Sequence, residues 1–319
     1  MPSTFIKAAE LWLPSGDGSL LELHSGAFGG ARRFEALSRS MCFGRSEGLP
    51  GRAWDEGKPV LLPDFNGVDF RRADAARQAG YSSAIALPYF REQAIAGVLV
   101  LFCSHDTNAS SALELWHHDA RNTPDMTLAS GAYAAGLQHF EAISHDTYLP
   151  RGMGLPGLAW QRGESVFLED LAAAPGRFLR AEMAAEAGLL RGLALPVGSR
   201  LDDCHVVTFL AGAQLPLAQR IERWVADDTR TSLKRDYAFS ELHGGRSGVA
   251  ATLAITADDL APTSSIAQAW RDGVPVISEQ PAAEEGAPAA AAAAIGAVAL
   301  LAIPVVWEGE VTEVVALYL

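Results

Sequence analysis

The sequence predicts an α+β protein made of tandem modules, each with a central antiparallel sheet flanked by short helices. Three observations support this prediction: an internal repeat, short apolar runs separated by Gly, Pro and Asp, and a composition suited to a folded chain. Of the 319 residues, 49% are hydrophobic and 20% are charged, which provides enough apolar surface for packed cores. A chain of this length is expected to hold two or three domains.

Three landmarks recur in the same order along the chain. They are a Glu-x-Trp sequence, a second tryptophan 42 to 46 residues later, and an Ala-Leu-Pro or Ala-Ile-Pro sequence a further 34 to 36 residues on. They end at Trp12, Trp54 and Pro88, then at Trp116, Trp160 and Pro196, and finally at Trp224, Trp270 and Pro304. This near-constant spacing predicts three modules, at residues 5–106, 110–214 and 218–319.

The first repeat also predicts the order of secondary-structure elements. Residues 11–24 form two apolar runs around a polar turn, which is typical of a hairpin. Short helices are expected at 34–41, 50–56 and 70–78, a strand at 59–63, and a second hairpin from strands at 84–89 and 94–103. This order gives an antiparallel sheet and a concave pocket between one of its faces and the helices.

One uncharged stretch, residues 289–306, has the composition of a membrane span. Its alanine run, Gly296 and the following apolar residues instead predict a helix, a glycine stop and a buried strand. No secretory signal is visible at the N-terminus. We therefore expect a cytoplasmic protein that does not cross a membrane.

Several of these motifs resemble the GAF domain family. The motifs are Gly-Leu-Pro-Gly-x-Ala-Trp-x-x-Gly at 48–57 and 154–163, Pro-Val-Leu-Leu-Pro-Asp-Phe at 59–65, and the segment 70–80 before Ala-Leu-Pro. The resemblance covers nearly the whole chain and is weakest in the third module, where Gly-Leu-Pro-Gly is lost. It implies a small-molecule-binding or protein-interaction module, commonly sensory and dimeric, whose ligands across the family include cyclic nucleotides, tetrapyrroles and small metabolites. It implies no particular cofactor.

The chain departs from the usual GAF arrangement in one respect. GAF modules usually carry long flanking helices that couple to an output enzyme, whereas only residues 104–111 separate the first module from the second. We expect any signalling output to reside in a separate protein.

Candidate ligand-binding residues occupy matching positions in the first two modules. An aspartate ends the strand after each second tryptophan, and a Phe-x-Arg-Ala-acid sequence begins the next helix. An arginine beside aromatic rings can clamp a carboxylate or phosphate through two hydrogen bonds, and a carboxylate can accept a hydrogen bond from an amine. The candidates are Trp54, Asp64, Phe65, Phe70, Arg72 and Asp74 in the first module, and Trp160, Asp170, Phe178, Arg180 and Glu182 in the second.

Each candidate also has a purely structural interpretation. The arginines and the acids near them are favoured to lie on the exposed helix face or in a local ion pair. The tryptophans are favoured as packing anchors in a core. The third module has Pro288 where the others have Arg72 and Arg180, so no arginine clamp is expected there and this module is predicted to be structural or a contact surface.

The cysteines and histidines give weak signals. Cys42, Cys103 and Cys204 form no CxxC pair, so neither a zinc site nor a disulfide framework is predicted and a reducing compartment is expected. His117-His118-Asp119 resembles a metal-binding fragment. However, adjacent side chains on a strand point to opposite faces, so a hairpin turn is the simpler location and no metal ligand is predicted.

Charge and missing motifs narrow the function. The 25 basic against 38 acidic residues give a net charge of −13, which opposes nucleic-acid and anionic-membrane partners. Signatures for P-loops, dinucleotide binding and hydrolases are absent, so an enzyme is not predicted. The leading hypothesis is a sensory protein that binds an unidentified small molecule in the first module, the second or both, and reports it through contacts. A homo-oligomer such as a homodimer is what the family resemblance implies. The alternatives are a ligand-free scaffold and a cysteine-based reductase.

Overall fold

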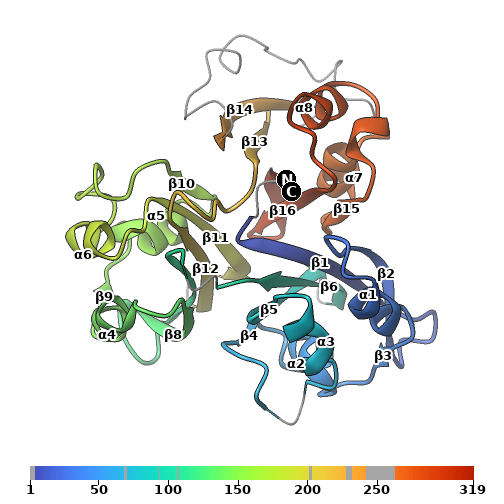
Figure 1. Cartoon of the computed structure of the whole chain (residues 1–319), viewed down its shortest axis with the longest axis horizontal. Helices are drawn as coiled ribbons and strands as arrows, with labels where there is room; N and C mark the ends of the chain where they lie inside the picture. The colour runs from blue at the N-terminus through green and yellow to red at the C-terminus, as the bar shows by residue number, and fades with distance from the viewer. Residues whose placement is uncertain are drawn as a thin grey trace.

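The computed structural model describes residues 4–67, 70–92, 94–105, 108–200, 203–227, 232–241 and 263–319. In this part of the chain, three antiparallel sheets form, and the strands of each sheet fall within one predicted module (Figure 1). Short helices flank each sheet, so the predicted α+β class is confirmed. We call the three ranges modules 1, 2 and 3. Residues 242–262 of the predicted third module lie outside the described part.

The three sheets share one strand order. Module 1 contains β1 (Ile6–Pro14), β2 (Leu21–Ala27), α1 (Arg32–Arg39), β3 (Cys42–Phe43), α2 (Gly48–Glu56), β4 (Val60–Leu62), α3 (Ala73–Gln78), β5 (Ser83–Arg91) and β6 (Ala94–Cys103). Module 2 contains β7 (Ser111–Asp119), β8 (Met126–Tyr133), α4 (Gln138–His145), β9 (Tyr148–Leu149), α5 (Gly154–Arg162), β10 (Val166–Leu168), α6 (Ala181–Glu186), β11 (Arg191–Arg200) and β12 (Asp203–Ala211). Module 3 contains β13 (Arg220–Ala226), β14 (Leu233–Ser240), α7 (Ser265–Asp272), β15 (Val276–Ser278), a 3₁₀ helix η3 (Pro281–Ala283), α8 (Ala287–Ile295), β16 (Leu300–Trp307) and β17 (Glu310–Tyr318). The order is β3-β2-β1-β6-β5-β4 in module 1, β9-β8-β7-β12-β11-β10 in module 2 and β14-β13-β17-β16-β15 in module 3.

The predicted elements are present, with shifts of a few residues at their ends. The helix that carries the second tryptophan ends in each module at a glycine with positive φ: 63° at Gly57, 64° at Gly163 and 64° at Gly273. Glycine adopts this left-handed conformation at no steric cost. The uncharged stretch 289–306 is divided as predicted, into α8, Gly296 at a φ of 66°, and β16. Among the described helices, none is long and apolar enough to span a membrane.

The central strands are buried on both faces, which explains their continuous apolar sequences. In β6, Leu99 and Leu101 point to one side of the sheet and Val98, Val100 and Phe102 to the other, and all five are fully buried. The second side packs against the helices of module 1. The first side packs against the other two modules.

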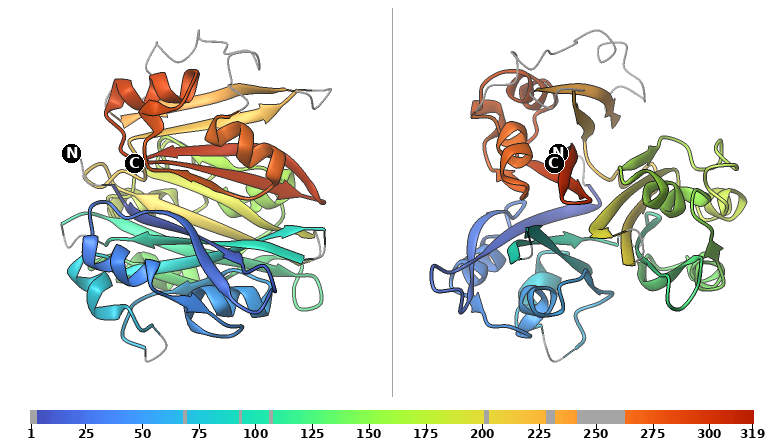
Figure 2. Two further views of the ribbon diagram at one scale, coloured as in Figure 1. Left: turned by 90° about the vertical axis from the view of Figure 1, so that its right-hand side faces the viewer. Right: turned by 180° about the vertical axis from the view of Figure 1, so that it is seen from behind.

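A core shared by all three modules forms on this inner side of the sheets. We call it the shared core; it includes Leu87 and Leu99 of module 1, Leu115 and Leu195 of module 2, and Ile303 and Leu317 of module 3. Figures 1 and 2 show the sheets gathered around this centre, with the helices on the outside of each lobe. The inner face of each sheet is therefore buried against the other two modules.

The junctions between modules follow one rule. The strand after the second tryptophan contacts the second hairpin strand of the next module: β4 contacts β8, and β15 contacts β2. At the remaining junction, Phe167 of β10 packs on Tyr237 and Phe239 of β14, with ring centroids 5.8 and 5.2 Å apart. Each contact joins different surfaces of similar modules, and the series closes into a ring after three.

The third landmark of the repeat lies where the modules meet. Pro88, Pro196 and Pro304 line one small cavity of about 30 Å³, together with Tyr89 and Val197. The proline that follows Ala-Leu or Ala-Ile in each repeat therefore marks a contact between all three modules.

Candidate functional site

A buried ion pair occupies the same position in modules 1 and 2. Arg72, before the first turn of α3, reaches 62 residues back along the sequence to Glu10 on β1. Its Nη2 donates to Glu10 Oε2 at 3.0 Å, and its Nη1 donates to Glu10 Oε1 and to Ser38 Oγ. Arg72 is 2% exposed and Glu10 is 0% exposed. The interpretation of Arg72 as a residue of the exposed helix face is therefore wrong.

Module 2 repeats the arrangement. The Nη1 and Nη2 atoms of Arg180 donate to Glu114 at 2.6 and 2.8 Å, and Nη1 also donates to Ser144 Oγ. Tyr133 adds a hydrogen bond from its hydroxyl to Glu114 Oε1 at 3.0 Å. Both guanidinium groups thus bind a carboxylate of their own chain through two hydrogen bonds, the geometry expected for capture of an external carboxylate.

The Glu-x-Trp landmark is explained by these carboxylates. In all three modules the tryptophan is fully buried, and its indole N–H donates to the glutamate two residues earlier, at 2.9 to 3.0 Å. Residues two apart on a strand lie on the same face. The landmark therefore places a charged group and a large ring together in the core on the helix side of each sheet.

Opposing effects act on the buried carboxylate of module 2. Burial alone would raise the pKa of Glu114, because it penalises the charged form. The charge and hydrogen bonds of Arg180, with those of Trp116 and Tyr133, outweigh burial and lower the pKa below its ordinary value of 4.5. Glu114 is thus held ionised inside the core.

The aromatic candidates of module 1 lie beside the ion pair. Phe65 and Phe70 are stacked with ring centroids 4.7 Å apart, and the Arg72 guanidinium lies 5.5 Å from the Phe70 ring. Trp54 is 3% exposed and has Arg45 over its ring at 4.3 Å. These side chains occupy the space between sheet and helices, where a pocket was expected. Ligand binding by them remains a prediction.

Module 2 places its candidates in the same way. Phe178 is 1% exposed and lies 5.1 Å from the Arg180 guanidinium. Trp160 is 3% exposed and lies against His118, with ring centroids 4.0 Å apart. Both tryptophans of the Gly-Leu-Pro-Gly helices are therefore in module cores, as expected for packing anchors.

The acidic candidates lie away from these clusters. Asp74 and Glu182 are exposed, and Asp74 pairs with Arg77 one turn along α3 at 3.0 Å. Asp64 accepts a hydrogen bond from the backbone N–H of Asn66, and Asp170 accepts from Ala172 and Ala173. The structure does not bring Asp64 or Asp74 to Arg72.

Module 3 keeps the buried carboxylate and replaces its partner. Glu222 is fully buried and accepts hydrogen bonds from Arg220 at 2.7 Å, from Arg235 at 3.0 Å and from the Tyr318 hydroxyl at 3.0 Å. These donors come from the sheet instead of from a helix start. Module 3 has no arginine at position 288, but Arg220 and Arg235 supply the positive charge that Glu222 needs. Comparing only the positions equivalent to Arg72 did not predict these two partners.

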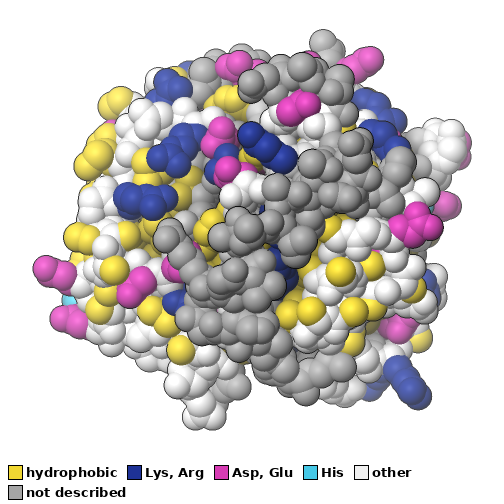
Figure 3. Space-filling view, turned by 90° about the horizontal axis from the view of Figure 1, so that it is seen from above, with side chains coloured by type: hydrophobic (Ala, Val, Ile, Leu, Met, Phe, Trp, Pro, Cys, Tyr) yellow, Lys and Arg dark blue, Asp and Glu magenta, His cyan; other side chains and the backbone are white. Residues whose placement is uncertain are grey.

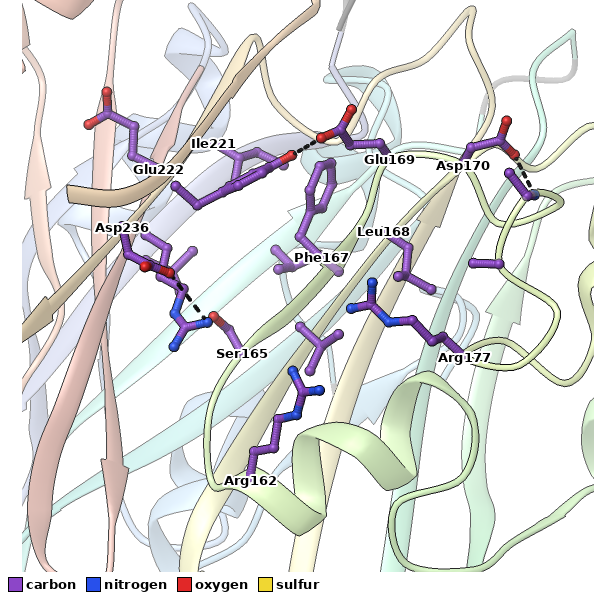
Figure 4. A pocket seen from close by; sticks show the side chains of 17 residues that line it. Arg162, Ser165, Phe167, Leu168, Glu169, Asp170, Arg177, Ile221, Glu222 and Asp236 are labelled. Atoms are coloured by element: carbon purple, nitrogen blue, oxygen red, sulfur yellow. Dashed lines mark hydrogen bonds and ion pairs between the residues drawn. The ribbon is translucent and has the colours of Figure 1, made fainter. Parts of the chain in front are cut away.

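A larger cavity lies at the junction of modules 2 and 3 (Figure 4). We call it the junction cavity; its volume is about 450 Å³. Module 2 contributes the end of α5, strand β10 and the following loop, and module 3 contributes β13 and β14. Leu168, Ile221 and part of Phe167 provide an apolar wall, and Asp170 of the candidate set lies at its rim.

Two arginines in the junction cavity carry unpaired charge. Arg162 extends from the end of α5 and Arg177 from the loop before α6, and Figure 4 shows both entering the cavity. Neither guanidinium group has a hydrogen-bond or ion-pair partner among the residues that the structure describes. The other charged groups are occupied: Arg223 pairs with Glu164 at 2.8 Å, and Glu169 accepts from the Tyr237 hydroxyl at 2.7 Å.

Sequence reasoning did not select Arg162 or Arg177. The alignment of modules draws attention to positions that match, and these two arginines correspond to Glu56 and Asp69 in module 1. Their role depends on a surface that another module supplies. The signal that could have found them is the reversal of charge between matching positions.

The cysteines occupy different environments. Cys42 is exposed, whereas Cys103 and Cys204 are buried. Burial raises the pKa of Cys103 well above its ordinary value and that of Cys204 to about 12. Both buried thiols are therefore protonated at neutral pH, and the thiolate is the nucleophilic form.

Surface charge is mixed on the face shown in Figure 3. Lys and Arg side chains lie among Asp and Glu side chains, with hydrophobic atoms between them. The net charge of the chain is −13. Such a surface offers a polyanion little electrostatic attraction, and the absence of a nucleic-acid partner remains a prediction.

Comparisons with known proteins identify a family for the N-terminal part. The GAF domain family model matches residues 4–118. The solved GAF domain of A. aeolicus nlh2 is 18% identical, covering 32% of this chain and 59% of its own, with a TM-score of 0.26. A free methionine-R-sulfoxide reductase from Neisseria meningitidis is 19% identical, covering 31% of this chain and 52% of its own, with a TM-score of 0.25. A mutated NreA protein from Staphylococcus aureus is 15% identical, covering 31% and 73%, with a TM-score of 0.26.

This chain spans less than two thirds of the length of the first two of these proteins. No curated protein matches it. A GAF domain supports a sensory or regulatory role in general terms. Residues 4–118, which include the antiparallel sheet of module 1 and its short helices, therefore form a GAF domain.

Proposed function

We propose that this chain is a non-catalytic sensory protein that binds a small organic anion in the junction cavity. The observation that carries the proposal is the convergence of Arg162 and Arg177 on a cavity of about 450 Å³, with guanidinium groups that have no partner among the described residues. A carboxylate or phosphate is the group that guanidinium donors bind best. The nearby apolar wall suits a ligand with a hydrocarbon or ring portion.

A ligand bound in this cavity can change the separation of modules 2 and 3. The two arginines and Leu168 belong to module 2, whereas Ile221 and Tyr237 belong to module 3. A ligand that touches both sides binds best at one separation and stabilises that separation. The proposed output is a change in the surface that the chain presents to a separate partner protein.

Thermal unfolding in the presence of small carboxylates and phosphates tests the proposal. A ligand present at 100 times its dissociation constant adds about 2.7 kcal/mol to the free energy of unfolding, so a rise in Tm is expected for the anions that bind. Arg162→Gln with Arg177→Gln should abolish that rise. Arg32→Gln removes the same charge from an exposed site on α1 and should leave it unchanged.

Loss of the Tm rise in Arg32→Gln as well would show general charge screening instead of a site. No rise with any carboxylate, phosphate, nucleotide or tetrapyrrole would favour the competing function, a ligand-free scaffold. One observation favours the scaffold in module 1, because Trp54, Phe65, Phe70 and Arg72 are all at most 7% exposed. A scaffold would use the outer surfaces of the ring of modules for self-association or for a partner.

A further inference from the structure

Two sequence fragments that seemed unrelated lie side by side in module 2. His117 is on β7 and His205 is on β12, and these residues are directly paired in the antiparallel register. Their imidazole rings are stacked with centroids 4.1 Å apart and planes at 13°. The location of His117 in a hairpin turn was therefore predicted wrongly. His118 lies on the other face of the sheet, as expected for its neighbour, where it contacts Trp160.

An aspartate completes the group. Asp203 precedes His205 by two residues on β12, so both side chains lie on one face of the strand. Its Oδ1 lies 2.9 Å from His117 Nε2. One potential ligand atom from each of His117, Asp203 and His205 lies within 4.8 Å of the other two. Ligand atoms at about 2.0–2.1 Å from a tetrahedral zinc ion lie roughly 3.3 Å apart. Side-chain rotations that move each ligand atom by about 1 Å would therefore bring the three atoms to metal-binding distances.

The repeat shows that this group is not required by the fold. The residue after the first landmark tryptophan is Leu13 in module 1 and Val225 in module 3, where module 2 has His117. Opposite Val225 in module 3 lies Glu313. Module 2 thus has a pair of imidazoles at a position where the same sheet forms elsewhere with aliphatic residues on this strand.

The surroundings leave two of the three side chains accessible to an ion, and His205 is more buried. The side chains of His117 and Asp203 are 30% and 47% exposed. The next acid on this face, Asp119, accepts hydrogen bonds from Arg121 and Asn122. Asp203 is therefore the carboxylate that remains available to the histidine pair.

We propose that His117, Asp203 and His205 bind a divalent transition-metal ion. Two imidazole nitrogens and one carboxylate oxygen suit Zn²⁺, Co²⁺, Ni²⁺ or Cu²⁺ better than Mg²⁺ or Ca²⁺, which prefer oxygen ligands. Three protein ligands leave a fourth position that faces solvent, and a water molecule or an exogenous ligand fills it. The site is distinct from the junction cavity and does not depend on the proposed sensory function.

Calorimetric titration of the untagged full chain with ZnCl₂ tests this site. The background carries Cys42→Ser, which removes the exposed thiol. We expect one zinc ion per chain. His117→Gln and His205→Gln should each weaken binding by at least about tenfold, and so should Asp203→Asn, which changes an exposed residue. His139→Gln, an exposed histidine on α4, is the matched control and should bind zinc like the parent.

Cobalt provides an independent readout. Co²⁺ in a four-coordinate site with nitrogen and oxygen ligands gives visible absorption bands far stronger than those of hydrated Co²⁺. These bands should appear in the parent and in His139→Gln, and disappear in His205→Gln. Zinc binding by the parent that survives all three ligand substitutions would overturn the proposal, as would the absence of zinc binding by the parent. Circular dichroism of each variant confirms that the fold is retained.

Discussion

Removing Arg180 should destabilise the protein far more than removing an exposed arginine. Arg180→Met leaves the Glu114 carboxylate, which is 0% exposed, without its cation inside the core. Breaking a buried ion pair in this way costs about 3–5 kcal/mol. Stacking of the guanidinium over the Phe140 ring at 4.6 Å is lost as well. Arg177→Met removes an exposed side chain whose guanidinium has no described partner, and it should change the free energy of unfolding by less than about 0.5 kcal/mol.

The second substitution separates pairing from packing. In Arg180→Met with Glu114→Gln, the amide oxygen can still accept from the Trp116 indole, and the amide NH2 can donate to the Tyr133 hydroxyl oxygen. Replacing both charges is expected to cost only about 1–2 kcal/mol, so the double variant should be more stable than Arg180→Met alone. Urea unfolding followed by circular dichroism and tryptophan fluorescence measures the free energy of unfolding of the two single variants and of the double variant. A single variant that loses less than about 1 kcal/mol, or a double variant that loses the sum of the single losses, would refute the ion-pair argument.

Two further predictions concern a module junction and acid stability. A Cβ atom at Gly163 would lie 2.4 Å from Trp307 Cγ, whereas at Gly57, with nearly the same φ, the nearest atom is 3.6 Å away. Gly57→Ala should therefore cost about 1–2 kcal/mol and Gly163→Ala about 1–3 kcal/mol more, measured by urea unfolding; equal losses would contradict the junction contact. Burial lowers the pKa of His105 to about 4 from 6.5, so the unfolded chain takes up a proton first and stability should fall as the pH decreases from about 6.5 to about 4, by up to about 3 kcal/mol. His105→Gln should flatten this part of the pH profile, and an unchanged profile would assign the loss to other groups.

The sequence predicted the sheets well because the repeated landmarks are core residues. Trp12 and its counterparts are fully buried, and the Ala-Leu-Pro sequences lie in central strands. Such positions are dictated by local strand and helix periods together with burial, which a single sequence displays. Because the pattern occurs three times, each predicted element was also supported by the matching segments of the other modules.

The charged residues were harder to place because their partners are remote in sequence. Arg72 at a helix start looks exposed when only its neighbours are considered, but its partner Glu10 lies 62 residues away on β1. Burial of an arginine is tolerated when a carboxylate meets it with two hydrogen bonds. The recurrence of glutamate before each landmark tryptophan was visible, and a buried glutamate requires a cation.

The junction cavity and the histidine pair depend on features beyond the local pattern. Arg162 and Tyr237 line one cavity because modules 2 and 3 meet there, and a module boundary in the sequence does not indicate which surfaces will touch. His117 and His205 meet because of the register between β7 and β12. A shift of one residue would turn one of them to the other face.

The arrangement of the modules explains how the third can diverge from the others. Its helix side has lost Gly-Leu-Pro-Gly and the helix-borne arginine, yet Ile221, Ile303 and Leu317 still enter the shared core. Head-to-tail junctions close only when every module is present, and removing one would expose the inner sheet faces of the other two. The physical requirement on module 3 is therefore an apolar inner face and two junction surfaces, which leaves its helix side free to change. This explains why Glu222 could exchange a helix-borne partner for Arg220 and Arg235 on the sheet.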